Sequence, residues 1–123
     1  MTMPNMTSFE FADVVLVRFP FTDQSSSKQR PAVVVSSSAY HQERRDVVLM
    51  AVTSRVSKPL TVGEALVTDW LGAGLIKPSL LKPILMTAEK SIVRKRLGRL
   101  GEADRQAVVG CLNAILGPTS PSK

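Results

Sequence analysis

Two polar residues, Arg30 and Thr53, stand at the ends of apolar segments, where packing gives no reason for a polar side chain. Arginine offers planar, fixed N–H donors that match phosphate oxygens, and threonine adds a neutral hydroxyl that binds phosphate without a competing charge. Together they suit a phosphodiester. The spacing alone leaves open an ordinary salt-bridged arginine and a threonine that simply ends a strand.

Other residues that could do chemistry are few. His41 is the only histidine, and we expect it at the surface in a loop after the second strand, where a lone histidine is usually not catalytic. With Cys111 as the only cysteine, an internal disulfide and a Cys/His zinc site are excluded. The aspartates are scattered without a local ligand motif, so we expect neither a metal nor a cofactor.

Two short motifs resemble nucleotide-binding loops only superficially. Lys77 replaces the third glycine of a dinucleotide fingerprint that would begin at Gly72, and no βαβ pattern surrounds it, so we interpret Gly72–Gly74 as a turn. The serines and lysine of 25–28 lack the glycines of a P-loop. The sequence therefore argues against ATP or GTP binding.

The composition indicates one compact domain that prefers an anionic partner. The chain has 123 residues, of which 44% are hydrophobic, and it carries a net charge of +6 with a pI near 10.0. Its longest apolar runs are far shorter than the roughly 18 residues of a membrane span. The first residues lack the pattern of a secretory signal, so we expect a cytoplasmic protein that does not bind a membrane.

The periodicity predicts strands first and a helix last. Valine-rich and alternating segments predict strands, whereas apolar pairs recurring every four residues predict a helix over 102–116 that Gly117 ends. Pro31 should keep Arg30 extended at the mouth of the second strand. We expect a domain over 9–117 between loose ends 1–8 and 118–123: a small antiparallel sheet or open barrel closed by the helix. The expected strands cover 13–19, 32–36, 46–53, 64–68, 79–85 and, more weakly, 91–97.

Basic and aromatic side chains leave alternatives open. The cations near the last strand could follow a phosphate backbone, or they could keep a sheet edge soluble. Trp70 could be exposed for base stacking or could belong to the core, where most of the aromatic residues, Met50 and Met86 should lie. The cations are Lys90, Arg94, Lys95, Arg96 and Arg99.

Four segments, in this order, resemble the PemK/MazF family of toxins from type II toxin–antitoxin systems over about residues 9–117. They are 13–23 (DVVLVRFPFTD), 30–36 (RPAVVVS), 48–54 (VLMAVTS) and 95–100 (KRLGRL). The resemblance implies a mainly β fold with α structure, a small SH3-like antiparallel barrel closed by a C-terminal helix, and a homodimer. It also implies a cognate acidic antitoxin that covers the RNA groove.

The same resemblance implies a sequence-specific endoribonuclease that cleaves single-stranded RNA, chiefly mRNA, without a metal, by attack of the ribose 2′-hydroxyl. Arg30 and Thr53 match the family's active-site positions, with Ser54 as a helper. The polar loop and nearby residues would bind the RNA and select its bases. These expected RNA-binding residues are Thr22, Asp23, Ser25, Ser26, Ser27, Lys28, Gln29, Lys77 and Ser79.

The chain departs from the family at Ala12, where the family usually has glycine, and at Met86, where it often has an arginine before the threonine. Lys77, Lys82 or Lys90 could replace that arginine. The general base is left open among Glu43, Asp23 and His41. Two rival functions also remain: a non-catalytic toxin that inhibits a protein target such as DNA gyrase, and an SH3-like regulator that binds nucleic acid.

Overall fold

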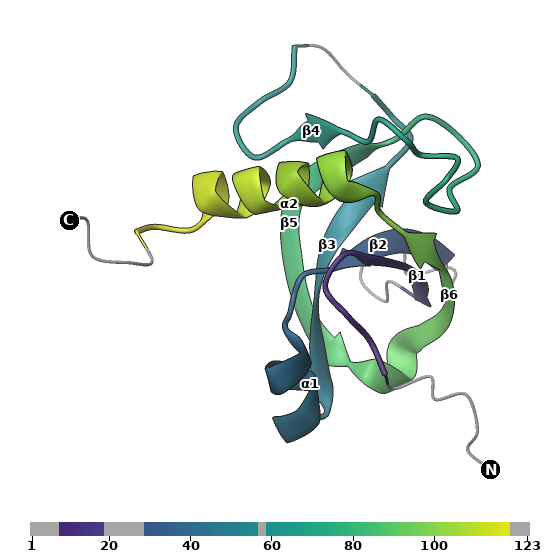
Figure 1. Cartoon of the computed structure of the whole chain (residues 1–123), viewed down its shortest axis with the longest axis vertical. Helices are drawn as coiled ribbons and strands as arrows, with labels where there is room; N and C mark the ends of the chain where they lie inside the picture. Colours follow the sequence, from purple (N-terminus) through teal and green to yellow (C-terminus); the bar gives the residue numbers. More distant parts are fainter. Residues whose placement is uncertain (1–7, 19–28, 57–58, 119–123) are drawn as a thin grey trace.

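The computed structural model describes residues 8–18, 29–56 and 59–118 (Figure 1). In these ranges six strands precede the long helix α2, which spans Glu102–Ile115 and confirms the predicted C-terminal helix. None of the described helices is long and apolar enough to cross a membrane. The remaining elements are β1 (Asp13–Arg18), β2 (Gln29–Val34), α1 (Ser38–Glu43), β3 (Asp46–Thr53), β4 (Ala65–Leu66), β5 (Leu80–Glu89), the 3-10 turn η1 (Lys90–Ile92) and β6 (Val93–Arg99).

The strands form one antiparallel sheet in the order β4-β5-β3-β2-β1-β6. Figure 1 shows this sheet coiled, with β3 and β5 running along the molecule and α2 crossing it. The mainly β architecture with a terminal helix is confirmed. The barrel is not closed by pairing, however, because β4 and β6 end the order without being paired to each other in the described part of the chain.

Several boundaries differ from the prediction. The second strand begins at Gln29, so Arg30 lies inside β2, where pairing with β1 extends the backbone. The segment Ser38–Glu43, predicted as a loop, forms α1 with Ser37 as its N-cap. The strand expected over 64–68 contracts to two residues, and that expected over 91–97 begins at Val93 after η1. The predicted ends 1–8 and 118–123 lie almost wholly outside the described residues.

Alternation along the strands divides the apolar residues between two cores. One core lies between the sheet and α2 and includes Val33 and Met50 from neighbouring strands together with Val108 and Cys111 from the helix. The other lies on the opposite face and includes Ala32 and its neighbours on β1, with the half-buried Met86 packed against it. Burial raises the pKa of the Cys111 thiol, which favours a packing role over a reactive one.

Buried carboxylates fix the start of β1 and of α2. Asp13 is fully buried and accepts hydrogen bonds from Arg99 Nε at 2.8 Å and from the backbone N–H of Glu10 at 2.9 Å, with Arg96 at 3.1 Å. The Asp13 contact raises the pKa of the Arg99 guanidinium. Asp104 accepts hydrogen bonds from the backbone N–H groups of Thr68 and Asp69. These contacts anchor β6 and the turn that begins at residue 68.

Candidate functional site

A small cleft brings together the ends of β2 and β3 and the segment before β5. Its volume is about 230 Å³, below the roughly 300–1,000 Å³ of pockets that enclose a drug-sized ligand. It is therefore suited to part of a longer molecule that lies across the surface. The lining residues are Gln29, Arg30, Pro31, Val52, Thr53, Ser54, Leu75, Ile76, Lys77 and Ser79.

Pairing on the outer sides of β2 and β3 holds the two central residues. Arg30 is opposite Val17 of β1, and Thr53 is opposite Leu80 of β5. Between β2 and β3, pairing runs only as far as Ala32 opposite Ala51. Continuing that register by two residues places Arg30 opposite Thr53, and residues opposite each other project to the same face of a sheet. The cleft lies between these two strand ends.

A turn brings the third wall to the cleft. Gly74 has a φ of +91° and packs against the backbone of Leu97 so closely that a Cβ atom would overlap its carbonyl. This contact with β6 fixes the start of the segment that carries Lys77. The buried Ser79 then donates its hydroxyl to the carbonyl of Lys77 at 2.8 Å. The interpretation of Gly72–Gly74 as a turn is confirmed.

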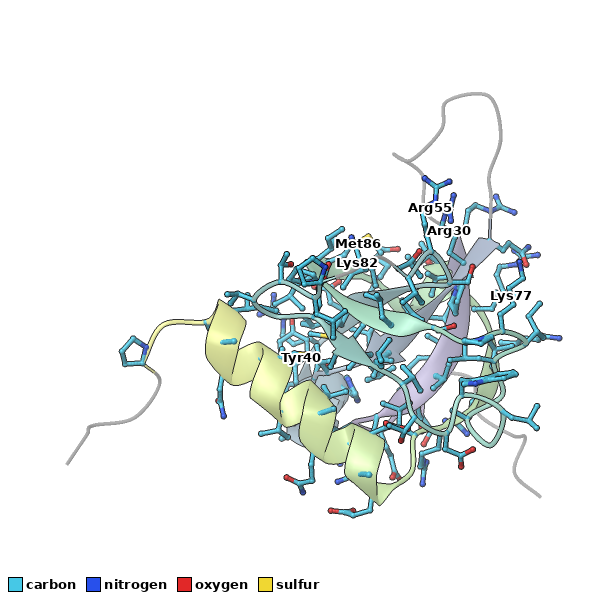
Figure 2. All side chains as sticks on the ribbon, turned by 90° about the horizontal axis from the view of Figure 1, so that it is seen from above. Arg30, Tyr40, Arg55, Lys77, Lys82 and Met86 are labelled. Atoms are coloured by element: carbon cyan, nitrogen blue, oxygen red, sulfur yellow. The ribbon has the colours of Figure 1, made fainter. Side chains whose placement is uncertain are left out.

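The cleft presents donors and positive charge. Arg30 and Lys77 are exposed, and the described lining includes no carboxylate and no histidine. Thr53 Oγ1 accepts the backbone N–H of Arg55 at 3.1 Å, which leaves the hydroxyl proton available to donate into the cleft. Figure 2 shows Arg30 and Arg55 at the side of the molecule away from α2. The arrangement suits an anion such as a phosphate.

All the predicted site residues that the structure describes gather in this cleft. Arg30, Thr53 and Ser54 lie there together with the predicted RNA-binding residues Gln29, Lys77 and Ser79. The other predicted RNA-binding residues, Thr22, Asp23, Ser25, Ser26, Ser27 and Lys28, lie outside the described residues.

Of the three lysines that could replace an arginine at Met86, only Lys77 lines the cleft. Lys82 lies 3.6 Å from the carboxylate of Glu64, and Lys90 donates to the carbonyl of His41 at 2.7 Å. Hydrogen bonding by the backbone N–H of Thr61, aided by Lys82, lowers the pKa of Glu64.

Two of the candidate general bases, His41 and Glu43, lie away from the cleft that contains Arg30 and Thr53. His41 belongs to α1, is 6% exposed and bonds to Ser36 Oγ at 2.6 Å and to the carbonyl of Phe9 at 2.9 Å. The expectation of a surface loop histidine is therefore wrong. Glu43 and His41 line a separate cavity of about 470 Å³, and Asp23 lies outside the described residues.

The basic cluster near β6 has mainly structural contacts. β6 is an edge strand, and Arg96 and Arg99 both bind the buried Asp13. Arg94 and Lys95 are exposed. These contacts favour the interpretation as a charged sheet edge. Trp70 is half-buried against the core, which supports the core alternative for this residue.

Leu75 and Ile76 also line the cleft, although no sequence motif predicted them there. Ile76 is 87% exposed beside Lys77 and offers an apolar surface that a base could contact. The only local signal was an apolar pair directly after a predicted turn. The position of Leu75 and Ile76 depends on the packing of Gly74 against β6, which the local sequence does not reveal.

Comparisons with known proteins agree with this architecture. Residues 10–116 match the family model described as "PemK-like, MazF-like toxin of type II toxin-antitoxin system". No curated protein sequence matches the chain. Among solved structures, an endoribonuclease in complex with its cognate antitoxin from mycobacterial species is 17% identical, with a TM-score of 0.70 over 91% of this chain and 98% of that one.

Two further solved structures have the same fold at similar sequence distance. A MazE–MazF complex from Deinococcus radiodurans is 22% identical, with a TM-score of 0.69 over 89% of this chain and 96% of that chain. The Mycobacterium tuberculosis toxin MazF-mt6 is 17% identical, with a TM-score of 0.66 over 83% and 94%. Since the family model covers most of the sequence, the chain belongs to the PemK-like, MazF-like toxins of type II toxin–antitoxin systems.

Proposed function

We propose that this toxin is a metal-independent, sequence-specific endoribonuclease that cleaves single-stranded RNA, chiefly mRNA, in the cytoplasm. The observation that carries the proposal is the meeting of Arg30 and Thr53, from two different strands, in one cationic cleft. Solved structures of the same fold are named endoribonucleases, which supports the reaction class.

The reaction we propose is an internal transfer at phosphorus. The ribose 2′-hydroxyl loses its proton as its oxygen bonds to the adjacent phosphorus, the bond from phosphorus to the 5′-oxygen breaks, and the 5′-oxygen takes up a proton. The products are a 2′,3′-cyclic phosphate and a 5′-hydroxyl end. Arg30 stabilises the charge on the pentacovalent phosphate, because a guanidinium remains protonated and is a poor proton carrier. Thr53 donates its hydroxyl to a non-bridging oxygen, and Ser54 assists beside it. DNA lacks the 2′-hydroxyl and is not cleaved.

We assign RNA binding to the rim of the cleft and to residues 22–28, which the sequence predicts as a loop before β2. Gln29 offers an exposed amide, and Lys77 supplies a cation to the cleft, which Met86 does not line. Ser79 fixes the Lys77 segment through its hydrogen bond to the Lys77 carbonyl. The predicted loop residues from Thr22 to Lys28 would read base edges, which unpaired RNA exposes.

Charge supports both the absence of a metal and the nature of the partner. In the part of the chain that the structure describes, the cleft is lined by cations and hydroxyls rather than by the carboxylates that Mg²⁺ prefers. An acidic antitoxin segment would bind the same cleft and block the RNA, consistent with the net charge of +6. We propose a homodimer as the active form.

The test is incubation of the purified protein with defined single-stranded RNA in EDTA. Wild type should cleave at a fixed sequence and leave cyclic phosphate ends, whereas Arg30→Ala should not. Arg94→Ala removes an exposed arginine of the β6 edge and should cleave as wild type does. Intact RNA with wild type, or equal cleavage by wild type and Arg30→Ala, would refute the proposal. Growth arrest by Arg30→Ala in cells with intact mRNA would indicate a non-catalytic inhibitor instead.

A further inference from the structure

The pairing of β2 stops earlier on one side than on the other. Towards β1 it continues to Arg30 and Gln29, opposite Val17 and Arg18. Towards β3 it ends at Ala32 opposite Ala51, although β3 itself continues to Thr53. The loss of pairing is therefore confined to the side of β2 that faces the cleft.

The hydrogen-bond directions show which bond of the β2–β3 ladder Pro31 cannot make. The backbone N–H of Val35 donates to the carbonyl of Val48 at 2.9 Å, so this position faces β3. Backbone directions alternate along a strand, which makes residues 33 and 31 face β3 as well. In the same register, residue 31 is opposite Val52. Because proline has no N–H, the bond from residue 31 to the Val52 carbonyl cannot form.

This missing bond lies at the cleft. Pro31 and Val52 both line it, and Arg30 and Thr53 stand one residue farther along. We infer that Pro31 is a positioning residue, which ends the β2–β3 ladder and keeps the two strand ends apart so that a phosphate fits between Arg30 and Thr53. The effect on the sheet stands on the geometry alone, whereas the effect on cleavage rests on the proposed function.

The dimensions of a paired sheet show why the break matters. If the ladder continued, directly opposite residues would have Cα atoms about 4.5–5.5 Å apart, and their side chains would be in contact. Arg30 and Thr53 would then be held at this separation, which leaves less space for a ligand oxygen between them. A small displacement of catalytic groups can lower a rate up to about 100-fold.

Pro31→Ala tests the inference because it restores the N–H at position 31. In the free protein, the N–H of residue 31 should be protected from solvent exchange as that of Val33 is, with no loss of thermal stability. With defined RNA, kcat/KM should fall by about 10- to 100-fold. An RNA with 2′-deoxyribose at the cut site should bind more weakly to Pro31→Ala than to wild type. A merely structural role would lower the thermal stability without adding a protected N–H.

Two further proteins separate the N–H from other effects of the ring. Pro83→Ala changes a proline of β5 that does not line the cleft, and it should leave cleavage unchanged. N-methylalanine at position 31, introduced by ligation of peptide segments, lacks the N–H and should restore activity. Rapid exchange at residue 31, unchanged cleavage by Pro31→Ala, or no rescue by N-methylalanine would each overturn the inference. Wild type that cleaves no RNA would refute the proposed function, while the exchange measurement would still decide the effect on the sheet.

Discussion

The two ends of β2 carry polar residues in opposite situations. At its start, Arg30 meets Thr53 in an exposed cleft. Beyond its end, Ser36 and His41 are buried. The Phe9 carbonyl accepts from Nδ1 of the imidazole, Nε2 lies 2.6 Å from Ser36 Oγ, and Ser36 Oγ accepts the N–H of Val48 at 2.9 Å.

Whether a polar residue is exposed in a cleft or buried distinguishes functional from structural residues better than its type does. A serine within 2.6 Å of a histidine has the composition of a catalytic pair, yet its hydrogen bonds connect the N-terminal segment, α1 and β3. Arg30 lines the cleft and forms no hydrogen bond or ion pair with residues 8–18, 29–56 or 59–118. Exposure in a cleft, rather than a suggestive pair of residue types, indicates where a substrate binds.

The strongest test of this contrast is Arg30→Ala. We expect a loss of about 100- to 1,000-fold in the cleavage rate, because one preorganised donor to the transition state is removed. The free energy of unfolding should change by less than about 0.5 kcal/mol, as for most exposed positions. Initial rates and urea unfolding measure the two quantities. A large loss of stability would mean that Arg30 has a structural role after all.

Thr53→Val removes the hydroxyl but keeps the shape of the side chain. Losing a hydrogen bond to a charged phosphate costs about 1.5–3 kcal/mol, equivalent to roughly 10- to 150-fold in kcat/KM. Thr53→Ser keeps the hydroxyl and should retain most of the activity. If Val and Ser variants cleave equally well, the hydroxyl does not contact the reacting phosphate.

Asp13→Asn tests a buried carboxylate whose contacts stabilise the fold and do not reach the cleft. The amide cannot accept from Arg99, Arg96 and Glu10 as the carboxylate does, so we expect a loss of about 2 kcal/mol, typical for hydrogen bonds to a charged group. The loss stays moderate because both arginines are half-exposed and water can solvate them. Urea unfolding measures it, and kcat/KM at a temperature where the variant is folded should not change. A matching loss of kcat/KM would contradict the distinction between residues that stabilise the fold and residues that act in the cleft.

His41→Asn tests the end of β2 that does not line the cleft. Asparagine can still donate to the Phe9 carbonyl but cannot reach Ser36, so stability should fall by about 1 kcal/mol, the worth of one hydrogen bond. The pH profile of cleavage should keep its shape, because His41 does not line the cleft. Loss of a titration step near neutral pH would instead identify His41 as the general base.

How far the sequence predicted the molecule depends on the range of the interactions involved. The third strand, 46–53, was predicted with both ends because its apolar run is local. The helix Ser38–Glu43 was missed because six residues are too few for a helical period, and it is held by the Ser37 cap and by burial of His41. Arg30 and Thr53 were identified by type and position, and the structure places both in the cleft.

Lys77 joins the cleft for a reason that no local pattern contains. Its segment is placed by the contact of Gly74 with Leu97, between a turn and a strand that are distant in the chain. The break in the β2–β3 ladder could be predicted from the sequence only in part. Pro31 is visible in the sequence, but which neighbouring strand its nitrogen faces follows only from the register.

The smallest expected effect is that of Ala12→Gly, at the point where the sequence departs from the family. Ala12 is fully buried with a φ of +77°, a conformation that costs an L-residue about 1–2 kcal/mol. Glycine would relieve that strain, but it loses a buried methyl worth about 0.8 kcal/mol and adds about 0.4–1 kcal/mol of freedom to the unfolded chain. The terms nearly cancel, so stability should change by less than about 1 kcal/mol, which explains why alanine is tolerated here.

Ala32→Gly is the matched control, because Ala32 is equally buried but extended in β2. It loses the methyl and the backbone restriction with no strain to relieve, so it should destabilise the protein by about 1–2 kcal/mol. The difference between the two variants in urea unfolding therefore measures the strain at Ala12. Equal destabilisation would show that the positive φ costs nothing, and that the departure from glycine has no energetic consequence at the start of β1.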